Sequence, residues 1–220
     1  MKWIYLAAGI ALYIKMLVFP NLAAELATVD IVEIISQESG VSNTVSGIIF
    51  RNRLYDTIFE VVVFTLSIMG VRFLLSDEQP SCNIHQFTDH PSIVIAQLGA
   101  TIAAHIGIEL AIRGHLSPGG GFAAGVAGGT AIGLVAITTS TQRMESIYKR
   151  WHAATLEKVS VLIFIILAVV SLIGLQLPYG TPGTLMSGGW IPMLNILVAL
   201  KVTLGSWAAI LIFIRHRGLL

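Results

Sequence analysis

The chain has 220 residues, of which 55% are hydrophobic and only 11% are charged. A soluble domain usually carries about 25% charged residues, and the mean hydropathy of +0.82 also excludes that class, so the composition is that of an integral membrane protein. The 13 Lys and Arg and the 12 Asp and Glu leave a net charge of +1, which excludes nucleic acid as a main partner. The single cysteine, Cys82, excludes an intrachain disulfide and a four-thiolate iron–sulfur cluster, and no cofactor is expected in this chain.

Six apolar runs are long enough to cross a bilayer, which needs about 20 residues for each helix. In chain order they cover residues 3–19, 55–75, 92–116, 121–139, 156–177 and 194–214. Residues 21–53, between the first two runs, are predicted to hold an interfacial helix and a structured loop. The expected fold class is therefore all-α, a polytopic integral membrane protein with about six transmembrane helices.

An even number of spans places both termini on one side of the membrane. Lys and Arg are more frequent on that side, so the positive-inside rule predicts cytoplasmic termini for a multi-pass protein of the cell membrane. Residues 178–192 carry no charge, in agreement with a place on the opposite side. The polar segment 77–90 marks an internal boundary, and no sequence repeat supports a transporter built within this one chain.

Polar residues recur at every fourth position of the third run, in the order Gln97, Thr101, His105, Glu109 and Arg113. This spacing places them on one stripe of a helix whose other faces are apolar. Lipid cannot satisfy such groups, so the stripe is expected to face protein or a water-filled cavity. His105 is the natural proton relay because a histidine side chain can titrate near neutral pH, and Glu109, one turn away, would either raise its proton affinity or accept its proton. The alternative is that the stripe only holds helices together, with Glu109 paired to Arg113.

Further charged residues lie inside the apolar runs. Asp56 is expected to lie at the membrane interface and to cap the N-terminus of the second helix, and Glu60, four residues on, is either a structural residue of that end or a cation or proton carrier. Lys201 lies in the middle of the sixth run, too deep for its side chain to reach the interface, whereas Lys15 lies closer to a helix end. The charges of Lys15, Glu60, Glu109 and Lys201 sum to zero, which leaves pairing among them open.

Pro118 and three successive glycines join the third and fourth runs with almost no polar loop. The connection is predicted to be tight and irregular, either a plain hairpin turn or a break at which backbone groups and His115 face a cavity. Glycines then recur at four-residue spacing, which leaves one helix face nearly without side chains and favours close helix packing. These are Gly121, Gly125, Gly129 and Gly133.

Three segments carry a family resemblance: residues 113–122 (RGHLSPGGGF), 180–189 (GTPGTLMSGG) and 191–202 (IPMLNILVALKV). In this order they resemble the B subunit (MnhB or MrpB type) of Mrp-type multisubunit sodium/proton antiporters. The front part, with Asn43, Arg53 and a DTIFE segment that ends at Glu60, resembles the two-helix E-type subunit of membrane-bound hydrogenases. The resemblance predicts an E-type two-helix module in residues 1–80 and a B-type four-helix module in residues 81–220.

The resemblance implies a non-catalytic membrane subunit of a larger assembly that couples sodium and proton movement. By the same resemblance, Glu60 matches the acid of the family's DTxxE pattern and Lys201 the lysine of its LNxxVxLKV pattern. The candidate ion-pathway residues are Asp56, Glu60, His105, Glu109, His115 and Lys201. Expected partners are other antiporter-module membrane subunits, lipid, sodium ions and protons, and, in a redox-driven relative, hydrogenase-like or sulfur-reductase peripheral subunits.

The parent complex stays open between a stand-alone antiporter and a redox-driven hydrogenase-like or sulfur-reducing complex. This choice stays open because of two departures from the family pattern. Both modules lie in one chain, and Ala123 stands where antiporter B subunits usually carry a more polar residue. The main rival is a structural spacer subunit of a stand-alone Mrp antiporter. A stand-alone solute transporter is disfavoured by the missing repeat, and an intramembrane hydrolase by the lack of a Ser/His/Asp or HExxH pattern at membrane depth.

Overall fold

The computed structural model describes residues 31–81, 84 and 86–218. These residues form helices and loops, with no strand among them. The first predicted span, residues 3–19, lies outside this part of the chain together with Lys15. Residues Ile35–Leu220 form one compact unit, which contains the long helices described below.

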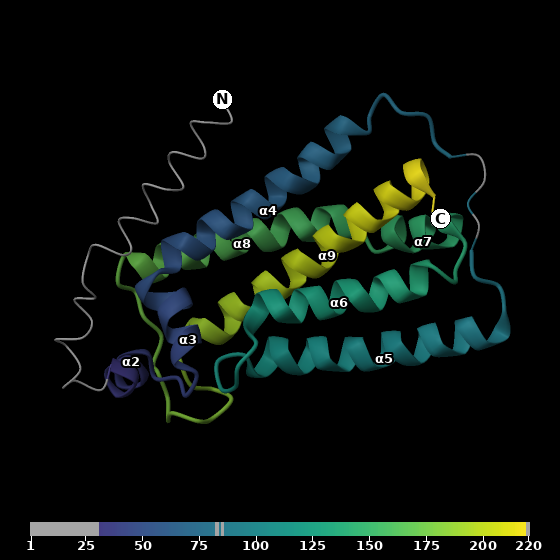
Figure 1. Ribbon diagram of the computed structural model, residues 1–220. Helices are drawn as coiled ribbons and strands as arrows, with labels where there is room; N and C mark the ends of the chain where they lie inside the picture. Colours follow the sequence, from purple (N-terminus) through teal and green to yellow (C-terminus); the bar gives the residue numbers. More distant parts are fainter. Residues whose placement is uncertain (1–30, 82–83, 85, 219–220) are drawn as a thin grey trace, which may run out of the picture. The chain divides into compact units, whose positions relative to one another are not determined.

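The long helices of this unit follow the predicted second to sixth runs (Figure 1). They are α4 (Leu54–Leu74), α5 (His90–Arg113), α6 (Gly120–Ala136), α8 (Ala153–Leu172) and α9 (Ile191–Arg217). Four of the described helices are long and apolar enough to cross a membrane, whereas α6 has only 17 residues. The all-helical, multi-pass membrane architecture is thereby confirmed, but the predicted total of about six spans is not.

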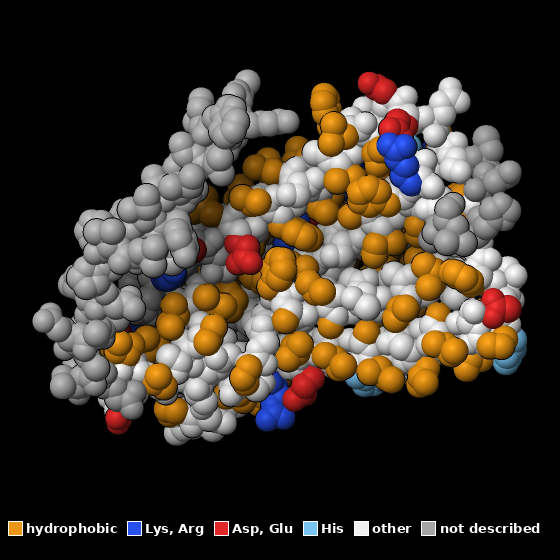
Figure 2. Space-filling view, viewed as in Figure 1, with side chains coloured by type: hydrophobic (Ala, Val, Ile, Leu, Met, Phe, Trp, Pro, Cys, Tyr) orange, Lys and Arg blue, Asp and Glu red, His pale blue; other side chains and the backbone are white. Residues whose placement is uncertain are grey.

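Short helices occupy the segments between the long ones. α2 (Ile31–Ser39), α3 (Thr44–Gly47) and the π-helical turn η2 (Ile48–Asn52) precede α4, and α7 (Thr141–Arg150) lies between α6 and α8. The space-filling view shows hydrophobic side chains over the long helices and only scattered charges (Figure 2). An apolar exterior of this kind is what a bilayer requires of helices that cross it.

Helix α9 is the central helix of the unit and contacts α4, α5, α6 and α8. Leu194 and Val202 of α9 share a hydrophobic cluster with Leu54 of α4 and Phe164 of α8. The cluster therefore joins residues from both sides of the predicted module boundary near residue 80. The division into an E-type and a B-type module stays a prediction, but the two parts fold around one core.

The spaced glycines of α6 lie against α9. A Cβ atom added to Gly125 would overlap the Val202 side chain and approach the Ala199 carbonyl oxygen to 2.9 Å, and one added to Gly129 would lie 2.7 Å from the Ser206 Cβ atom. At Gly133 the added atom would make an ordinary contact of 3.5 Å with Ile210. The backbones of α6 and α9 thus approach closely along most of the stripe, and this approach needs glycine.

Gly125→Ala is expected to destabilise the unit by about 1 to 3 kcal/mol, because the new methyl group overpacks the α6–α9 contact and one of its neighbours is backbone. Gly133→Ala is the matched control, since the site has room and alanine is favoured over glycine in a helix by about 1 kcal/mol. Thermal unfolding of the purified protein in detergent measures both. Equal stabilities of the two variants would contradict the close approach.

Candidate functional site

A buried ion pair joins α8 to α9. The Lys201 Nζ atom donates to the Glu157 Oε1 atom, and the two residues are 1% and 7% exposed. Lys201 lies near the middle of α9 and Glu157 in the second turn of α8. Both charges are removed from lipid and from bulk solvent, so each is stabilised mainly by the other.

Aromatic side chains close the site on the α4 side. The Lys201 ammonium lies 5.2 Å from the centroid of the Phe64 ring, an arrangement in which the face of the ring attracts the cation. Phe64 also makes an edge-to-face contact with Phe122 of α6, with 6.1 Å between ring centroids. Gly205 makes room for Phe64, since a Cβ atom there would lie 2.6 Å from the ring. Residues of α4, α6, α8 and α9 thus enclose one ion pair.

The sequence prediction placed Lys201 in the middle of an apolar run, and Lys201 lies buried near the middle of α9. The prediction missed the partner of Lys201. Pairing of Lys201 with Glu60 or Glu109 was left open, and neither pair forms. Glu157 lies one residue inside the predicted fifth run, beside Lys158, and was not among the predicted site residues. A carboxylate in the first turns of an otherwise apolar span was the available signal.

The predicted acids of α4 lie on its surface. Asp56 does not cap the helix; it is in the first turn and accepts a hydrogen bond of 2.6 Å from the Arg53 Nε atom. Glu60 is exposed, and within the described residues no hydrogen bond or ion pair involves it. The structure does not bring either acid to the Lys201 site, and their ion-path roles stay predictions.

The polar stripe of α5 is exposed along its length. Gln97, Thr101 and His105 are exposed, and the His105 Nδ1 atom lies 2.7 Å from the Thr101 carbonyl oxygen of its own helix. Glu109 accepts a hydrogen bond of 3.1 Å from Arg113, with side chains 60% and 52% exposed. The second half of the stripe, from His105 to Arg113, therefore faces lipid or another chain.

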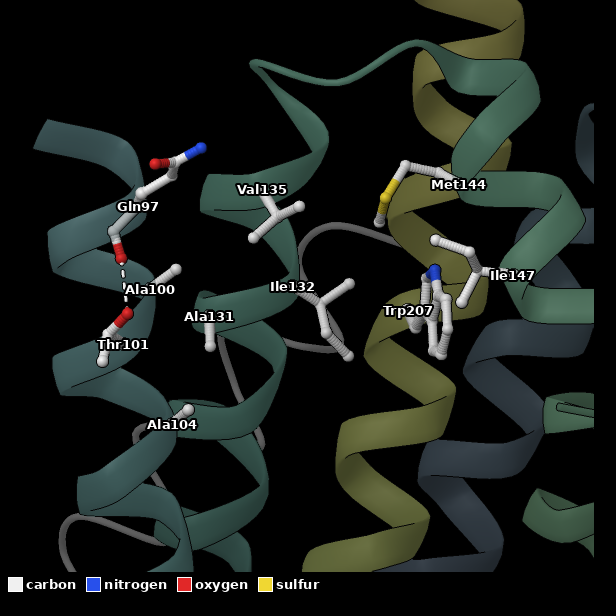
Figure 3. A pocket seen from close by; sticks show the side chains of 10 residues that line it. All are labelled: Gln97, Ala100, Thr101, Ala104, Ala131, Ile132, Val135, Met144, Ile147 and Trp207. Atoms are coloured by element: carbon white, nitrogen blue, oxygen red, sulfur yellow. Dashed lines mark hydrogen bonds between the residues drawn. The ribbon is translucent and has the colours of Figure 1, made fainter. Parts of the chain in front are cut away.

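A pocket of about 570 Å³ opens beside the first half of this stripe. Gln97 and Thr101 of α5 form one wall, Met144 of α7 and Trp207 of α9 form the opposite wall, and Ile132 of α6 lies between them (Figure 3). The lining is mostly apolar. No cluster of three or more His, Cys, Asp or Glu side chains suited to a metal ion occurs in the described residues.

The connection between α5 and α6 is held by asparagines from distant segments. The Asn43 side chain donates to the carbonyl oxygens of Gly114 at 2.7 Å and Ser117 at 2.8 Å, and Asn195 donates to Ala111 at 2.7 Å. The last carbonyl groups of a helix have no partner within it, so these bonds satisfy the C-terminal end of α5. The segment is a hairpin turn with satisfied backbone groups.

His115 lies inside this connection and is fully buried. Its Nε2 atom lies 3.4 Å from the Thr184 carbonyl oxygen, which brings together the two glycine motifs of the sequence. Burial lowers the pKa of His115 below its ordinary value of 6.5, against the opposing effect of the Thr184 and Leu185 backbone. Burial therefore favours the neutral form of His115, and its contact with Thr184 links the two motifs, while its role in an ion pathway stays a prediction.

The fold is that of a multi-pass membrane protein. Comparison with known families identifies the family to which the chain belongs. The model of the domain related to the MnhB subunit of Na+/H+ antiporters matches residues 91–208. This is more than half of the chain, so the chain belongs to that family and is an antiporter-type membrane subunit. A comparison with curated proteins gives no match.

Two solved structures share the fold. A chain of the membrane-bound sulfane sulfur reductase, an archaeal respiratory membrane complex, is 24% identical with a TM-score of 0.65, and the match covers 98% of this chain and 99% of that one. A chain of the Mrp complex from Dietzia sp. DQ12-45-1b is 17% identical with a TM-score of 0.60, covering 98% of this chain and 26% of that one. The present chain is thus about a quarter of the second chain in extent.

Asn43→Ala is expected to destabilise the connection by about 1 to 3 kcal/mol, because the Ser117 carbonyl group loses its asparagine donor and the Gly114 carbonyl group keeps only the Ser46 hydroxyl group. Ser42→Ala is the control, since Ser42 is exposed and adjacent. Limited proteolysis of the α5–α6 connection and thermal unfolding in detergent measure the effect. An unchanged cleavage rate in Asn43→Ala would show that the asparagine is dispensable.

Proposed function

We propose that this chain is a non-catalytic subunit of an Mrp-type sodium/proton antiporter module and that its Glu157–Lys201 pair is a proton-responsive element of the translocation path. The parent assembly is a redox-driven respiratory complex of the hydrogenase-like or sulfur-reducing kind. The chain lies in the cell membrane with both termini on the cytoplasmic side. The family membership and the two structural relatives support this assignment.

The burial of the ion pair is the observation that carries the proposal. Two charges inside a membrane protein are expensive to desolvate, and their replacement by apolar residues is often neutral or stabilising. A pair enclosed by Phe64, Phe122 and Gly205 is therefore a poor device for stability alone. Ionisable residues at such positions typically belong to ion or proton pathways.

The pair has two charge states that differ by one proton. When Glu157 is ionised, it holds the Lys201 ammonium beside it. A proton added to Glu157 removes the negative charge, so Lys201 loses its partner and responds by releasing its own proton or by turning to another anion. Protonation of Glu157 can therefore pass a proton along the path. It can also change the electrostatic potential at a neighbouring sodium ion.

The exposed stripe of α5 supports a partner on that face. A charged group at the centre of a membrane helix costs about 2.5 to 3.5 kcal/mol on insertion scales, and polar groups in membrane proteins seek protein or water. Thr101 and His105 lie near the middle of α5 and are exposed in this chain. The partner is a membrane helix of another antiporter-module subunit that carries polar side chains opposite this stripe.

A structural spacer is the second candidate function. The exposure of Glu60 and the pairing of Glu109 with Arg113 favour it, because neither acid has the enclosed setting of an ion carrier within this chain. The apolar exterior and the close-packed core of the chain would also suit a spacer.

The double variant Glu157→Gln with Lys201→Met separates the two candidates. Removal of one member of a buried pair destabilises by about 3 to 5 kcal/mol, whereas removal of both leaves no uncompensated charge, so the double variant is expected to assemble. Sodium-dependent proton flux in membrane vesicles that contain the whole complex is expected to be lost. Lys158→Gln, at an exposed neighbouring position, is expected to keep normal flux.

Normal flux in the assembled double variant would discard the ion-path proposal and favour the spacer. Glu60→Gln and Glu109→Gln, measured in the same vesicles, test the sequence-predicted carriers. Loss of flux in either variant, with assembly intact, assigns that acid to the path; wild-type flux in both removes them from it.

A photo-reactive amino acid in place of Thr101 or His105 is expected to form a covalent adduct with another membrane subunit in the native complex, because a partner helix covers this stripe. The chain produced alone is the control and is expected to give no such adduct. Mass spectrometry of the adducts identifies the partner. Adducts with lipid alone in the native complex would contradict the interface.

A further inference from the structure

A continuous groove runs along α6 between α5 and α9. Its first part is the pocket of about 570 Å³ beside Gln97 (Figure 3), and its second part is a cavity of about 340 Å³ farther along the same helices. Ala104, Ala131 and Ile132 line both parts, so the two parts form one groove. From Gln97 to Ala111 the groove follows α5 for about 21 Å, since an α-helix rises about 1.5 Å for each residue.

The polar side chains that line the groove and can bind a ligand lie at one end. Gln97 is exposed, and among the described residues no hydrogen bond involves its side-chain amide. The second part of the groove has one polar side chain, Thr203, whose hydroxyl group donates to the Gly125 carbonyl oxygen at 3.3 Å. Beyond Thr101 the lining therefore offers only apolar surface to an occupant.

The polar end of the groove lies beside α7, a short amphipathic helix. The sequence of α7 holds three basic residues and one acidic residue, and its buried residues include Met144, which lines the groove. Trp151, which follows the last residue of α7, is 66% exposed. Exposed tryptophans and basic residues are typical of the membrane interface, so this end of the groove lies at the level of the lipid head groups.

Arg143 is the basic residue of α7 that is placed beside the groove. It lies four residues before Ile147, so the two side chains share one stripe of α7, and Ile147 lines the groove. Arg143 is exposed and forms no ion pair with any other described residue. Lys149 differs on both counts, because it lies two residues from Ile147, on another face, and 3.9 Å from the Glu145 carboxylate.

We propose that this groove binds one anionic membrane lipid, with its head group at Arg143 and Gln97 and a hydrocarbon tail along Ala104 and Ile132. A cation, an amide and then apolar lining follow one another in the order of the parts of such a lipid. Both parts of the groove fall within the usual range of ligand pockets, about 300 to 1,000 Å³. Basic pockets between membrane helices bind anionic head groups, and this site does not depend on the ion-path role of Glu157 and Lys201.

A helix of another subunit fits the groove less well than a lipid tail. Membrane helices associate through small residues that let backbones approach, but the small residues here already serve the contact of α5 with α6. A Cβ atom added to Gly107 would lie 3.0 Å from the Ala124 carbonyl oxygen. The partner helix proposed for α5 can contact His105, which does not line the groove, so the lipid and that helix can be present together.

A diazirine analogue of leucine in place of Ile132 tests the groove, because Ile132 lines both of its parts. The assembled complex is placed in vesicles that hold equal amounts of phosphatidylglycerol and phosphatidylcholine, and mass spectrometry identifies the adducts after irradiation. Phosphatidylglycerol adducts are expected to exceed phosphatidylcholine adducts by about fivefold, the effect of one basic residue on an anionic head group. Equal yields of the two lipid adducts, or adducts with another subunit alone, would overturn the site.

Two pairs of variants locate the lipid. Arg143→Gln is expected to make the two adduct yields equal, whereas Lys149→Gln is expected to keep the preference for phosphatidylglycerol. Ala104→Phe fills the groove and is expected to lower the total lipid yield severalfold, and Ala103→Phe, beside it but not in the lining, is its control. An unchanged preference in Arg143→Gln, or an unchanged lipid yield in Ala104→Phe, would overturn the proposal.

Discussion

Charged groups within a bilayer must find partners in protein, and this constraint organises the whole unit. It is met inside the chain at one place, where Glu157 of α8 and Lys201 of α9 pair under the ring of Phe64. On the outer face of α5 the polar side chains of Thr101 and His105 are exposed, and their partners are backbone carbonyl groups of their own helix. The first place is the proton-responsive element that we propose, and the second is the proposed contact with a neighbouring subunit.

The approach of α6 to α9 positions the ion pair. Gly125 lets the α6 backbone lie against Val202, the residue that follows Lys201. Phe122, one turn earlier on α6, contacts the Phe64 ring that lies over the ammonium group. A side chain in place of Gly125 would separate α6 from α9 and open the enclosure of the ion pair. The enclosure therefore depends on the spaced glycines of α6.

The sequence predicted the features that depend on residues near one another in the chain. Hydropathy located α4, α5, α8 and α9, four-residue spacing located the glycine stripe, and the depth of Lys201 followed from its place in an apolar run. The family resemblance was confirmed for residues 91–208. Such features need only helical periodicity and the thickness of a bilayer.

Features that depend on how helices cross were not predictable. The partner of Lys201 was missed because the crossing of α8 and α9, which brings Glu157 to it, leaves no periodic signal. Periodicity aligned His105 with Glu109 but could not say whether that stripe faced inward. The capping role of Asn43 likewise needed the fold, since its bonds reach Gly114 and Ser117 far along the chain.

The shortness of α6 has a consequence for the surrounding bilayer. Its 17 residues rise about 25 Å, less than the roughly 30 Å of hydrocarbon in a typical membrane. Hydrophobic mismatch of this kind is relieved by local thinning or by neighbouring protein. Local thinning beside α6 would bring Lys201, on the adjacent helix α9, closer to the aqueous phases than a full-length span at the place of α6 would.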